Sequence, residues 1–338
     1  MPQSLSTTIT SPPPAAPAAP APAGPPVARR SRVARLRRNP GQPLRHSRAA
    51  GRLAVLAYHG VTDPRSFGAQ LDRLRRLATP VSLPDVERAV TEGRPLPPRS
   101  VLITFDDADR TVLTHALPEL AARRIPAAAF VIAELIGTDQ PFWWLEAEHL
   151  AQHGGRARAM GAYGGSGQLL AGLKALPDPD RRRSLQELRV SARCQAPRQE
   201  QLRPEDLHEL RAADVAIGNH TLGHPSLSRC DDHTVLAEIH GAHEILTKWL
   251  GEAPAAFAYP DGGYDPRADA VLRQLGYRLG FLSDHRLGPR LPTHPLRISR
   301  LQVDSTTSIR RIDSLLSGLQ RSGLARLLDP LRRPAAAG

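Results

Sequence analysis

Short apolar runs alternate with amphipathic segments from residue 53 onward, and this alternation restricts the possible folds more than any other feature of the chain. The runs have the length of buried strands, whereas the segments between them repeat apolar residues at helical spacing. Parallel strands need crossover connections, which are usually helices, so the order predicts an α/β fold built as an open sheet or a barrel. The expected strands are Leu53–Tyr58, Val101–Phe105, Ala127–Ala133, Val215–Gly218, Ala255–Tyr259 and Tyr277–Leu282. The expected helices are Ser66–Leu77, Asp85–Thr91, Thr111–Arg124, Pro204–Ala213, Asp231–Leu250 and Pro266–Leu275.

The composition changes along the chain and predicts one domain between two tails. Residues 1–50 are rich first in proline and alanine and then in arginine, which predicts a disordered tail. Residues 51–327 form the expected domain. Within it, residues 137–203 interrupt the alternation and are predicted to be a helical insertion over one rim. Residues 328–338 are expected to be a flexible C-terminal tail.

The net charge of +12 is concentrated near the N-terminus, because residues 1–62 contain nine arginines and no acidic residue. This tail could contact phosphates or anionic lipid by charge alone. No aromatic residue lies among its arginines to stack on bases, so no specific nucleic-acid partner is expected. The sequence shows neither an apolar signal segment nor a membrane span, which predicts a cytoplasmic protein and leaves peripheral attachment to a membrane open.

Cysteine usage points to a protein without a disulfide framework. The two cysteines, Cys194 and Cys230, could form a single bridge. Two free thiols in a reducing compartment are the simpler interpretation.

Acidic residues follow the second predicted strand in the segment Thr104–Asp109. Functional residues of parallel α/β folds gather at the carboxyl ends of the strands. Adjacent carboxylates such as Asp106 and Asp107 point in different directions, so one can bind a cation while the other handles a proton. The alternative is a polar turn in which Asp109 caps the next helix.

Two histidines, His220 and His224, follow the strand Val215–Gly218. Imidazoles four residues apart can reach one metal ion from a single turn. Two histidines and one carboxylate form a facial ligand set that leaves positions for water and substrate. A surface histidine pair without a metal is the alternative.

Two further strand ends carry candidate residues. The segment Phe257–Gly263 contains Pro260, Asp261 and two glycines, which require a tight turn that could aim a backbone N–H into the site. His59 follows the first strand and is equally compatible with a structural role.

The order of these motifs resembles the polysaccharide deacetylases that carry the NodB homology domain, carbohydrate esterase family 4. The resemblance extends from Leu53 to Val303. It implies a deformed (β/α) barrel of NodB type and metal-dependent removal of N-acetyl groups from a carbohydrate polymer or oligosaccharide. The matching segments are Ala54–His59, Thr104–Asp107, Ile125–Ala127, His220–His224 and Phe257–Pro260.

The resemblance also implies roles for individual residues. A metal-bound water, activated by Asp106 as general base, would attack the acetamide of an N-acetylated carbohydrate. The oxyanion would be bound by the backbone N–H of Asp261, in the turn with Tyr259 and Pro260. The aromatic and apolar groups considered for the sugar and the acetyl methyl are Trp143, Trp144 and Leu282. The implied ligands of a divalent ion, with zinc favoured, are Asp107, His220 and His224.

The chain departs from the usual family pattern at several positions. Ala108 replaces a glycine, and Ala258 stands where family members often have a base-orienting arginine, so that arginine is missing from this position. A Tyr-Pro variant without the arginine also occurs in the family. Asp261 replaces an aromatic residue, and its charge is expected to raise the pKa of Asp106.

The general acid cannot be located by motif. His294 is the first candidate, followed by His285 and His59. Two other functions stay open: a catalytically weak carbohydrate-binding protein on the same fold, and an amide hydrolase that acts on a small molecule.

Overall fold

A computed structural model describes residues 50–161 and 164–318 of the chain. Its centre is a curled sheet with the strand order β7-β6-β5-β4-β3-β1-β8, to which β2 adds beside β3 and β9 beside β1. All pairings are parallel except that of β1 with β8. The sheet is a half-barrel, which confirms the predicted α/β class and the deformed barrel. The strands are β1 (Arg52–Tyr58), β2 (Thr79–Pro80), β3 (Ser100–Phe105), β4 (Ala127–Val131), β5 (Val215–Asn219), β6 (Ala256–Ala258), β7 (Leu279–Phe281), β8 (Gly288–Pro289) and β9 (Leu301–Gln302).

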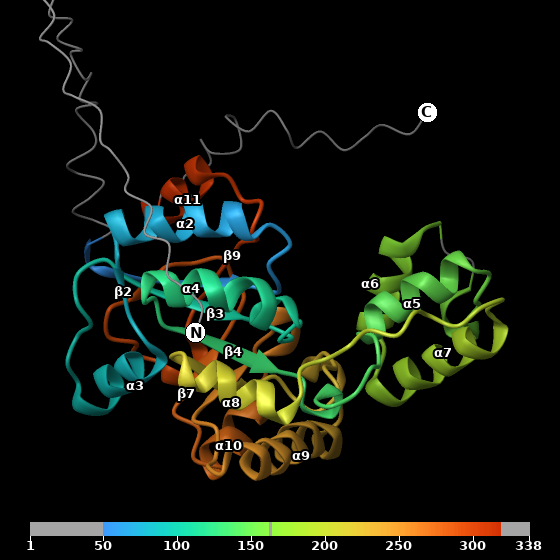
Figure 1. The fold of residues 1–338 in the computed structure, drawn as a ribbon. Helices are drawn as coiled ribbons and strands as arrows, with labels where there is room; N and C mark the ends of the chain where they lie inside the picture. Colours follow the sequence, from blue (N-terminus) through green and yellow to red (C-terminus); the bar gives the residue numbers. More distant parts are fainter. Residues whose placement is uncertain (1–49, 162–163, 319–338) are drawn as a thin grey trace, which may run out of the picture. The chain divides into compact units, whose positions relative to one another are not determined.

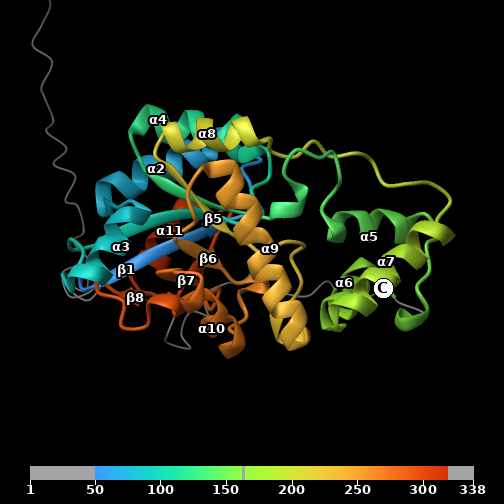
Figure 2. The same ribbon diagram turned by 90° about the horizontal axis from the view of Figure 1, so that it is seen from below.

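Helices alternate with these strands, as the sequence pattern predicts. Figures 1 and 2 show α2, α4 and α8 together on one side of the sheet and α9 and α10 around its β5–β7 end. The α-helices of the described chain are α2 (Pro64–Leu77), α3 (Leu83–Glu92), α4 (Leu117–Arg123), α5 (Trp143–Gln152), α6 (Ser166–Ala175), α7 (Asp178–Ser191), α8 (Pro204–Ala212), α9 (Asp232–Leu250), α10 (Pro266–Gln274) and α11 (Ile309–Leu316).

Alternating side chains of the strands build two separate cores. In β1, Leu56 and Tyr58 point into an outer core with α2, α4, α8, α9 and α11. Leu53 and Val55, on the opposite face, point into an inner core with α3, β4, β6 and β7. Both faces of the central strands are therefore buried, which explains why they read as continuous apolar runs instead of alternating ones.

The helix predicted at Thr111–Arg124 has an irregular first half. Val112–Ala116 is a π-helix, and α4 follows from Leu117. Pro118 in the first turn of α4 has no N–H to donate to the preceding turn, which accounts for the widened helix before it.

The predicted insertion, residues 137–203, contains α5, α6 and α7, and Figure 1 shows these helices together beside the barrel. They have an apolar cluster of their own, which includes Leu150, Leu169 and Leu188. The insertion therefore has its own small core. The predicted tails lie outside the described residues except for residue 50, and so do residues 319–327 of the predicted domain.

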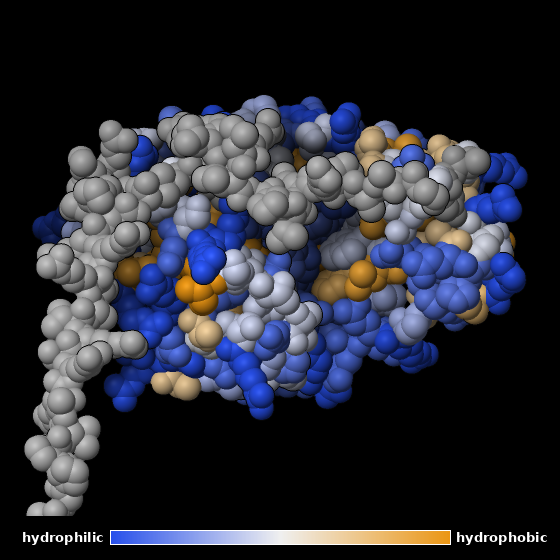
Figure 3. Space-filling model, turned by 90° about the horizontal axis from the view of Figure 1, so that it is seen from above, coloured by the Kyte–Doolittle hydropathy of each residue, from blue (hydrophilic) through white to orange (hydrophobic). Residues whose placement is uncertain are grey.

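The surface in Figure 3 is mostly hydrophilic, with small scattered apolar areas. The large apolar side chains that are exposed in the described chain are Leu145, Val190 and Leu236. Among the described helices, none has both the length and the apolar character needed to cross a bilayer. Neither cysteine is in a disulfide.

Gln70 on α2 connects the barrel to its last helix. Its side chain is 1% exposed and accepts a hydrogen bond from the Tyr58 hydroxyl at 2.8 Å. Its amide nitrogen donates to the carbonyl oxygens of Asp304, Ser305 and Thr307 at 2.8–3.2 Å. One buried amide thus satisfies groups from β1 and from the loop before α11.

We expect Gln70→Leu to lower the free energy of unfolding by about 2–4 kcal/mol, because a buried hydroxyl and several carbonyls lose their partner. Urea unfolding monitored by circular dichroism measures this loss. Arg75→Gln, on the exposed face of the same helix, should change stability by less than about 0.5 kcal/mol. Equal effects of the two substitutions would contradict the role of Gln70.

Candidate active site

A cavity of about 360 Å³ lies where the carboxyl ends of the strands meet. The segments that follow β1, β3, β5, β6 and β7 all contribute side chains to it, as expected for the functional edge of a parallel sheet. The lining residues are His59, Asp106, Asp107, Trp144, Leu170, Lys174, His220, His224, Asp261, Gly262, Ser283, His285 and Gln302.

The structure brings together the three predicted metal ligands. Asp107 Oδ1 lies 3.4 Å from Nε2 of His220 and 3.4 Å from Nε2 of His224. All three residues are buried, and these three atoms form a candidate metal-binding group. Residues more than a hundred positions apart thus meet because β3 and β5 end at the same edge.

The orientation of His220 is determined by its second ring nitrogen. His220 Nδ1 lies 2.8 Å from the carbonyl oxygen of Ala258. Because a carbonyl oxygen can only accept, Nδ1 carries the hydrogen, and the neutral ring presents a lone pair at Nε2. A backbone partner of this kind is typical of a metal-ligating histidine.

The donor set fits a divalent metal ion. Asp107 Oδ1, the atom that faces both imidazoles, is buried and has no hydrogen-bond partner among the described residues. Zinc-to-oxygen and zinc-to-nitrogen bonds of about 2.0–2.2 Å put the ligand atoms of a tetrahedral site roughly 3.3–3.5 Å apart. The observed separations match this spacing, so Asp107, His220 and His224 can hold such an ion.

The environment opposes protonation of two of these ligands. Burial raises the pKa of Asp107, but the neighbouring His220 and His224 outweigh it and lower the pKa to about 2. Burial lowers the pKa of His224 to about 4, despite the nearby carboxylates. For His220, burial lowers the pKa, while Asp106 and Asp107 more than compensate and raise it.

Asp106 lies beside this group and forms a buried ion pair with Arg300. Arg300 Nη1 and Nη2 donate to the two carboxylate oxygens of Asp106 at 2.6 and 2.7 Å. Arg300 is 0% exposed, and it also donates from Nη1 to Thr104 Oγ1 and from Nε to the Leu282 carbonyl. Although burial raises the pKa of Asp106, the charge of Arg300 outweighs it and lowers the pKa.

Position 258 has no arginine, as the sequence shows, but another residue makes this contact. Arg300, which precedes β9, reaches Asp106 through the inside of the barrel. The expectation that the charge of Asp261 raises the pKa of Asp106 is wrong, because the charge of Arg300 outweighs burial and lowers that pKa. The Asp261 carboxylate is paired with Lys174 and Ser226.

The predicted oxyanion turn contributes Asp261 to the cavity, while the side chains of its two neighbours lie elsewhere. Tyr259 is fully buried, and its hydroxyl donates to Asp269 Oδ1 at 2.8 Å. Pro260 is buried and does not line the cavity. The side chains of Tyr259 and Pro260 thus pack in the protein interior and not in the cavity.

The backbone is strained around the cavity. Six of the nine non-glycine residues with positive φ in the described chain lie in the segments that form it: Asp107, Ala108, Thr221, His224, Asp261 and His285. Ala108, which replaces the usual glycine, has a φ of 55°. The position thus has the conformation that favours glycine, and the chain holds alanine there at a cost.

The structure places the three candidate acids differently. His294 is exposed before the short helix Pro295–Arg297 and does not line the cavity. His59 and His285 both line it. His59 therefore shares the cavity with Asp106 and Asp107.

Sequence reasoning missed Arg300, Lys174 and Leu170. Arg300 is one of many arginines in the chain. The one sequence signal for it is that it directly precedes a short segment with alternating apolar residues, Leu301 and Val303, near the end of the domain. Lys174 and Leu170 lie on α6 in the insertion, where no motif marks them. Trp144 was considered for the substrate, and its ring lies 5.0 Å from that of His224. Leu282 does not line the cavity.

We expect Arg300→Met to destabilise the protein by about 3–5 kcal/mol at neutral pH, because it leaves the Asp106 carboxylate buried without a cation. Adding Asp106→Asn should restore part of this loss. The unpaired Asp106 carboxyl should have a raised pKa and become protonated as the pH falls. The free energy of unfolding lost in Arg300→Met should therefore be smaller at pH 4 than at pH 7. Urea unfolding at both pH values tests this. A double variant whose loss of stability equals the sum of the losses in the two single variants would contradict it.

A family model described as polysaccharide deacetylase matches residues 93–280, which is more than half of the chain. No curated protein matches the chain.

Solved structures share the fold at low sequence identity. A deacetylase from Streptococcus pyogenes, PplD in complex with acetate, is 18% identical, with a TM-score of 0.56 over 78% of this chain and 98% of that one. IcaB from Ammonifex degensii is 23% identical, with a TM-score of 0.55 over 80% and 97% of the two chains. A de-N-acetylase from Aggregatibacter actinomycetemcomitans is 15% identical, with a TM-score of 0.53 over 78% and 99%. With the family model matching most of the barrel, the chain belongs to the polysaccharide deacetylase family of hydrolases.

Proposed function

We propose that this protein is a metal-dependent hydrolase that removes acetyl groups from an N-acetylated carbohydrate polymer or oligosaccharide. One observation carries the proposal: a buried carboxylate, Asp106, lies beside the Asp107, His220 and His224 group in one cavity. A metal-binding group alone would serve a structural site. A second carboxylate, positioned by its own arginine, is what a hydrolytic reaction adds to it.

Asp107, His220 and His224 would hold the divalent ion, and zinc is favoured because it accepts nitrogen and oxygen donors in this number. When bound, such an ion lowers the pKa of water and polarises an acyl oxygen. The ligands leave further positions for water and substrate.

Asp106 would act as the general base. Its pKa lies below the usual value because of Arg300, so the carboxylate is ionised at neutral pH and ready to accept a proton from the attacking water. Arg300 holds both carboxylate oxygens by hydrogen bonds and thereby determines their direction. The backbone N–H of Asp261 would donate to the oxyanion that develops on the substrate.

His59 would act as the general acid in place of His294. It directly follows β1, which pairs with β3 in the register Tyr58 to Phe105, so His59 and Asp106 leave neighbouring strands at the same level. A proton donor at this point faces the leaving nitrogen while Asp106 faces the water. His285 lines the same cavity but follows β7, farther around the sheet.

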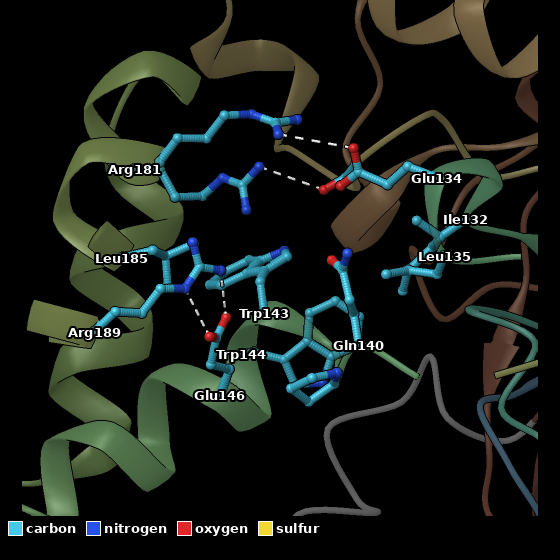
Figure 4. A pocket seen from close by; sticks show the side chains of 13 residues that line it. Ile132, Glu134, Leu135, Gln140, Trp143, Trp144, Glu146, Arg181, Leu185 and Arg189 are labelled. Atoms are coloured by element: carbon cyan, nitrogen blue, oxygen red, sulfur yellow. Dashed lines mark hydrogen bonds and ion pairs between the residues drawn. The ribbon is translucent and has the colours of Figure 1, made fainter. Parts of the chain in front are cut away.

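A second cavity, of about 600 Å³, shares the lining residue Trp144 with the site. In Figure 4, the indoles of Trp143 and Trp144 lie between the ion pair of Arg189 with Glu146 on one side and Gln140 on the other. Flat aromatic rings among hydrogen-bonding groups suit a sugar ring, which has apolar faces and hydroxyl edges. This cavity favours an extended carbohydrate over a small amide.

A catalytically weak binding protein agrees less well with these contacts. Its support was the absence of a base-orienting arginine at position 258, the unlocated acid and Ala108. Arg300 supplies the first of these, the contact with the base. A protein that only binds sugar has no need for an oriented, ionised carboxylate next to a metal-binding group.

We expect Asp106→Asn to lower the rate of acetate release from oligomers of N-acetylglucosamine by about 10²–10⁴-fold, since the base is lost. The same variant should keep the zinc content of the wild type. Asp107→Ala should bind one equivalent of zinc less than the wild type and should lose the activity. Enzymatic acetate determination and elemental analysis of the purified proteins measure the two quantities.

Asp109→Asn is the matched control, because Asp109 lies on the same turn and bonds to Thr111 outside the cavity. Its activity and metal content should stay near those of the wild type. An Asp106→Asn variant with full activity, or an Asp107→Ala variant with the full zinc content of the wild type, would contradict the assignment.

We expect His59→Gln to lower kcat by about 10²–10⁴-fold and to remove the alkaline limb of the pH–rate profile, because that limb reports the acid. His285→Gln and His294→Gln should keep the limb. If His285→Gln removes it instead, His285 is the acid.

A further inference from the structure

A second group of metal-ligating side chains lies in the insertion, away from the active-site cavity. His149 and His153 lie at the C-terminal end of α5, and Cys194 follows α7. One ligand atom from each lies within 4.8 Å of the other two. None of the three lines the cavity of the active site.

The spacing of the donor atoms suits a thiolate–imidazole site. His149 Nε2 lies 3.6 Å from Cys194 Sγ. Bonds of about 2.0–2.1 Å to nitrogen and 2.3 Å to sulfur put these atoms roughly 3.5 Å apart in a tetrahedral zinc site. A weak S–H···N hydrogen bond would explain this pair alone, but not the third donor. The His153 ring stacks on that of His149, with the centroids 4.1 Å apart.

The tautomer of His153 makes it a ligand in the neutral state. His153 Nδ1 lies 2.8 Å from the carbonyl oxygen of His149 and must donate, because that oxygen can only accept. The lone pair is therefore on Nε2. A backbone carbonyl that orients the non-ligating nitrogen is the usual second partner of a metal-bound histidine.

Backbone contacts hold the two parts of the group together without any ion. Arg193 N donates to the carbonyl oxygen of His153 at 3.0 Å, directly before Cys194. The turn after α5 packs tightly against α7: a side chain at Gly155 would lie 2.7 Å from the Leu150 carbonyl oxygen and 3.1 Å from that of Leu188. Helix α5 thus positions the two histidines, and the hydrogen bond of Arg193 holds the segment that carries Cys194 beside them.

We propose that His149, His153 and Cys194 form a second metal site that binds a borderline-soft divalent cation of the zinc class. Two imidazoles and a thiolate favour such a cation over calcium or magnesium, which prefer oxygen. The exposed Cys194 leaves a fourth position for water. The ion would connect the end of α5 to the segment after α7 and so stabilise the helix that carries Trp143 and Trp144. This site does not depend on the proposed function.

Cobalt(II) titration of the reduced protein tests the site, because a thiolate ligand adds an intense near-ultraviolet charge-transfer band that oxygen and nitrogen ligands do not produce. The wild type and Asp107→Ala should both show the band. Cys194→Ser should lack it and should bind one equivalent of zinc less than the wild type. Cys230→Ser is the matched control and should keep the band, because Cys230 is the other, buried cysteine.

His153→Gln provides an independent measurement. It should weaken cobalt binding at this site at least about tenfold, as expected for loss of one of three ligands. Far-ultraviolet circular dichroism verifies that each variant is folded. The absence of the band in the wild type, its survival in Cys194→Ser, or unchanged affinity in His153→Gln would each overturn the proposal.

Discussion

The buried ion pair between Arg300 and Asp106 is the interaction on which the rest of the site depends. It joins the end of β3 to the start of β9, and through the Leu282 carbonyl it also reaches the segment after β7. A buried guanidinium needs partners for its charge and its donors, and Asp106, Thr104 and the Leu282 carbonyl provide them here. The same contacts that complete the half-barrel therefore also orient and ionise the candidate base. Fold and site share this one constraint.

The insertion completes the cavity from the other side. Lys174 on α6 pairs with Asp261, and Trp143 on α5 donates from Nε1 to the carbonyl oxygen of His224 at 3.3 Å. The insertion thus contacts both the oxyanion turn and a candidate metal ligand. Because it also supplies most of the second cavity, substrate choice would depend on this segment more than on the barrel. A metal site at the far end of α5 would act on the same helix.

The backbone at the site is strained because several loops must turn sharply at the strand ends. Asp107 and Ala108 both adopt positive φ directly after β3, and His224 and Asp261 do so in the other loops. Each turn directs a side chain or an N–H into the cavity within one or two residues of a strand end. Non-glycine residues hold such conformations only when the surrounding contacts determine them. Here the hydrogen bonds of His220 to Ala258 and of His224 N to Thr221 Oγ1 contribute to that support.

The amino-acid sequence by itself determined the α/β class, the strand ends and the group formed by Asp106, Asp107, His220 and His224. Each of these depends on local periodicity or on a short motif at a strand end, and parallel strands bring such ends together. Arg300, Lys174 and the cavity around Trp143 were decided only by the tertiary structure. Their side chains reach the site from the inside of the barrel or from a separate helix cluster, and no local pattern encodes such a distance. The position of a long, charged side chain depends on how the elements pack, so its contacts are known only from the tertiary structure.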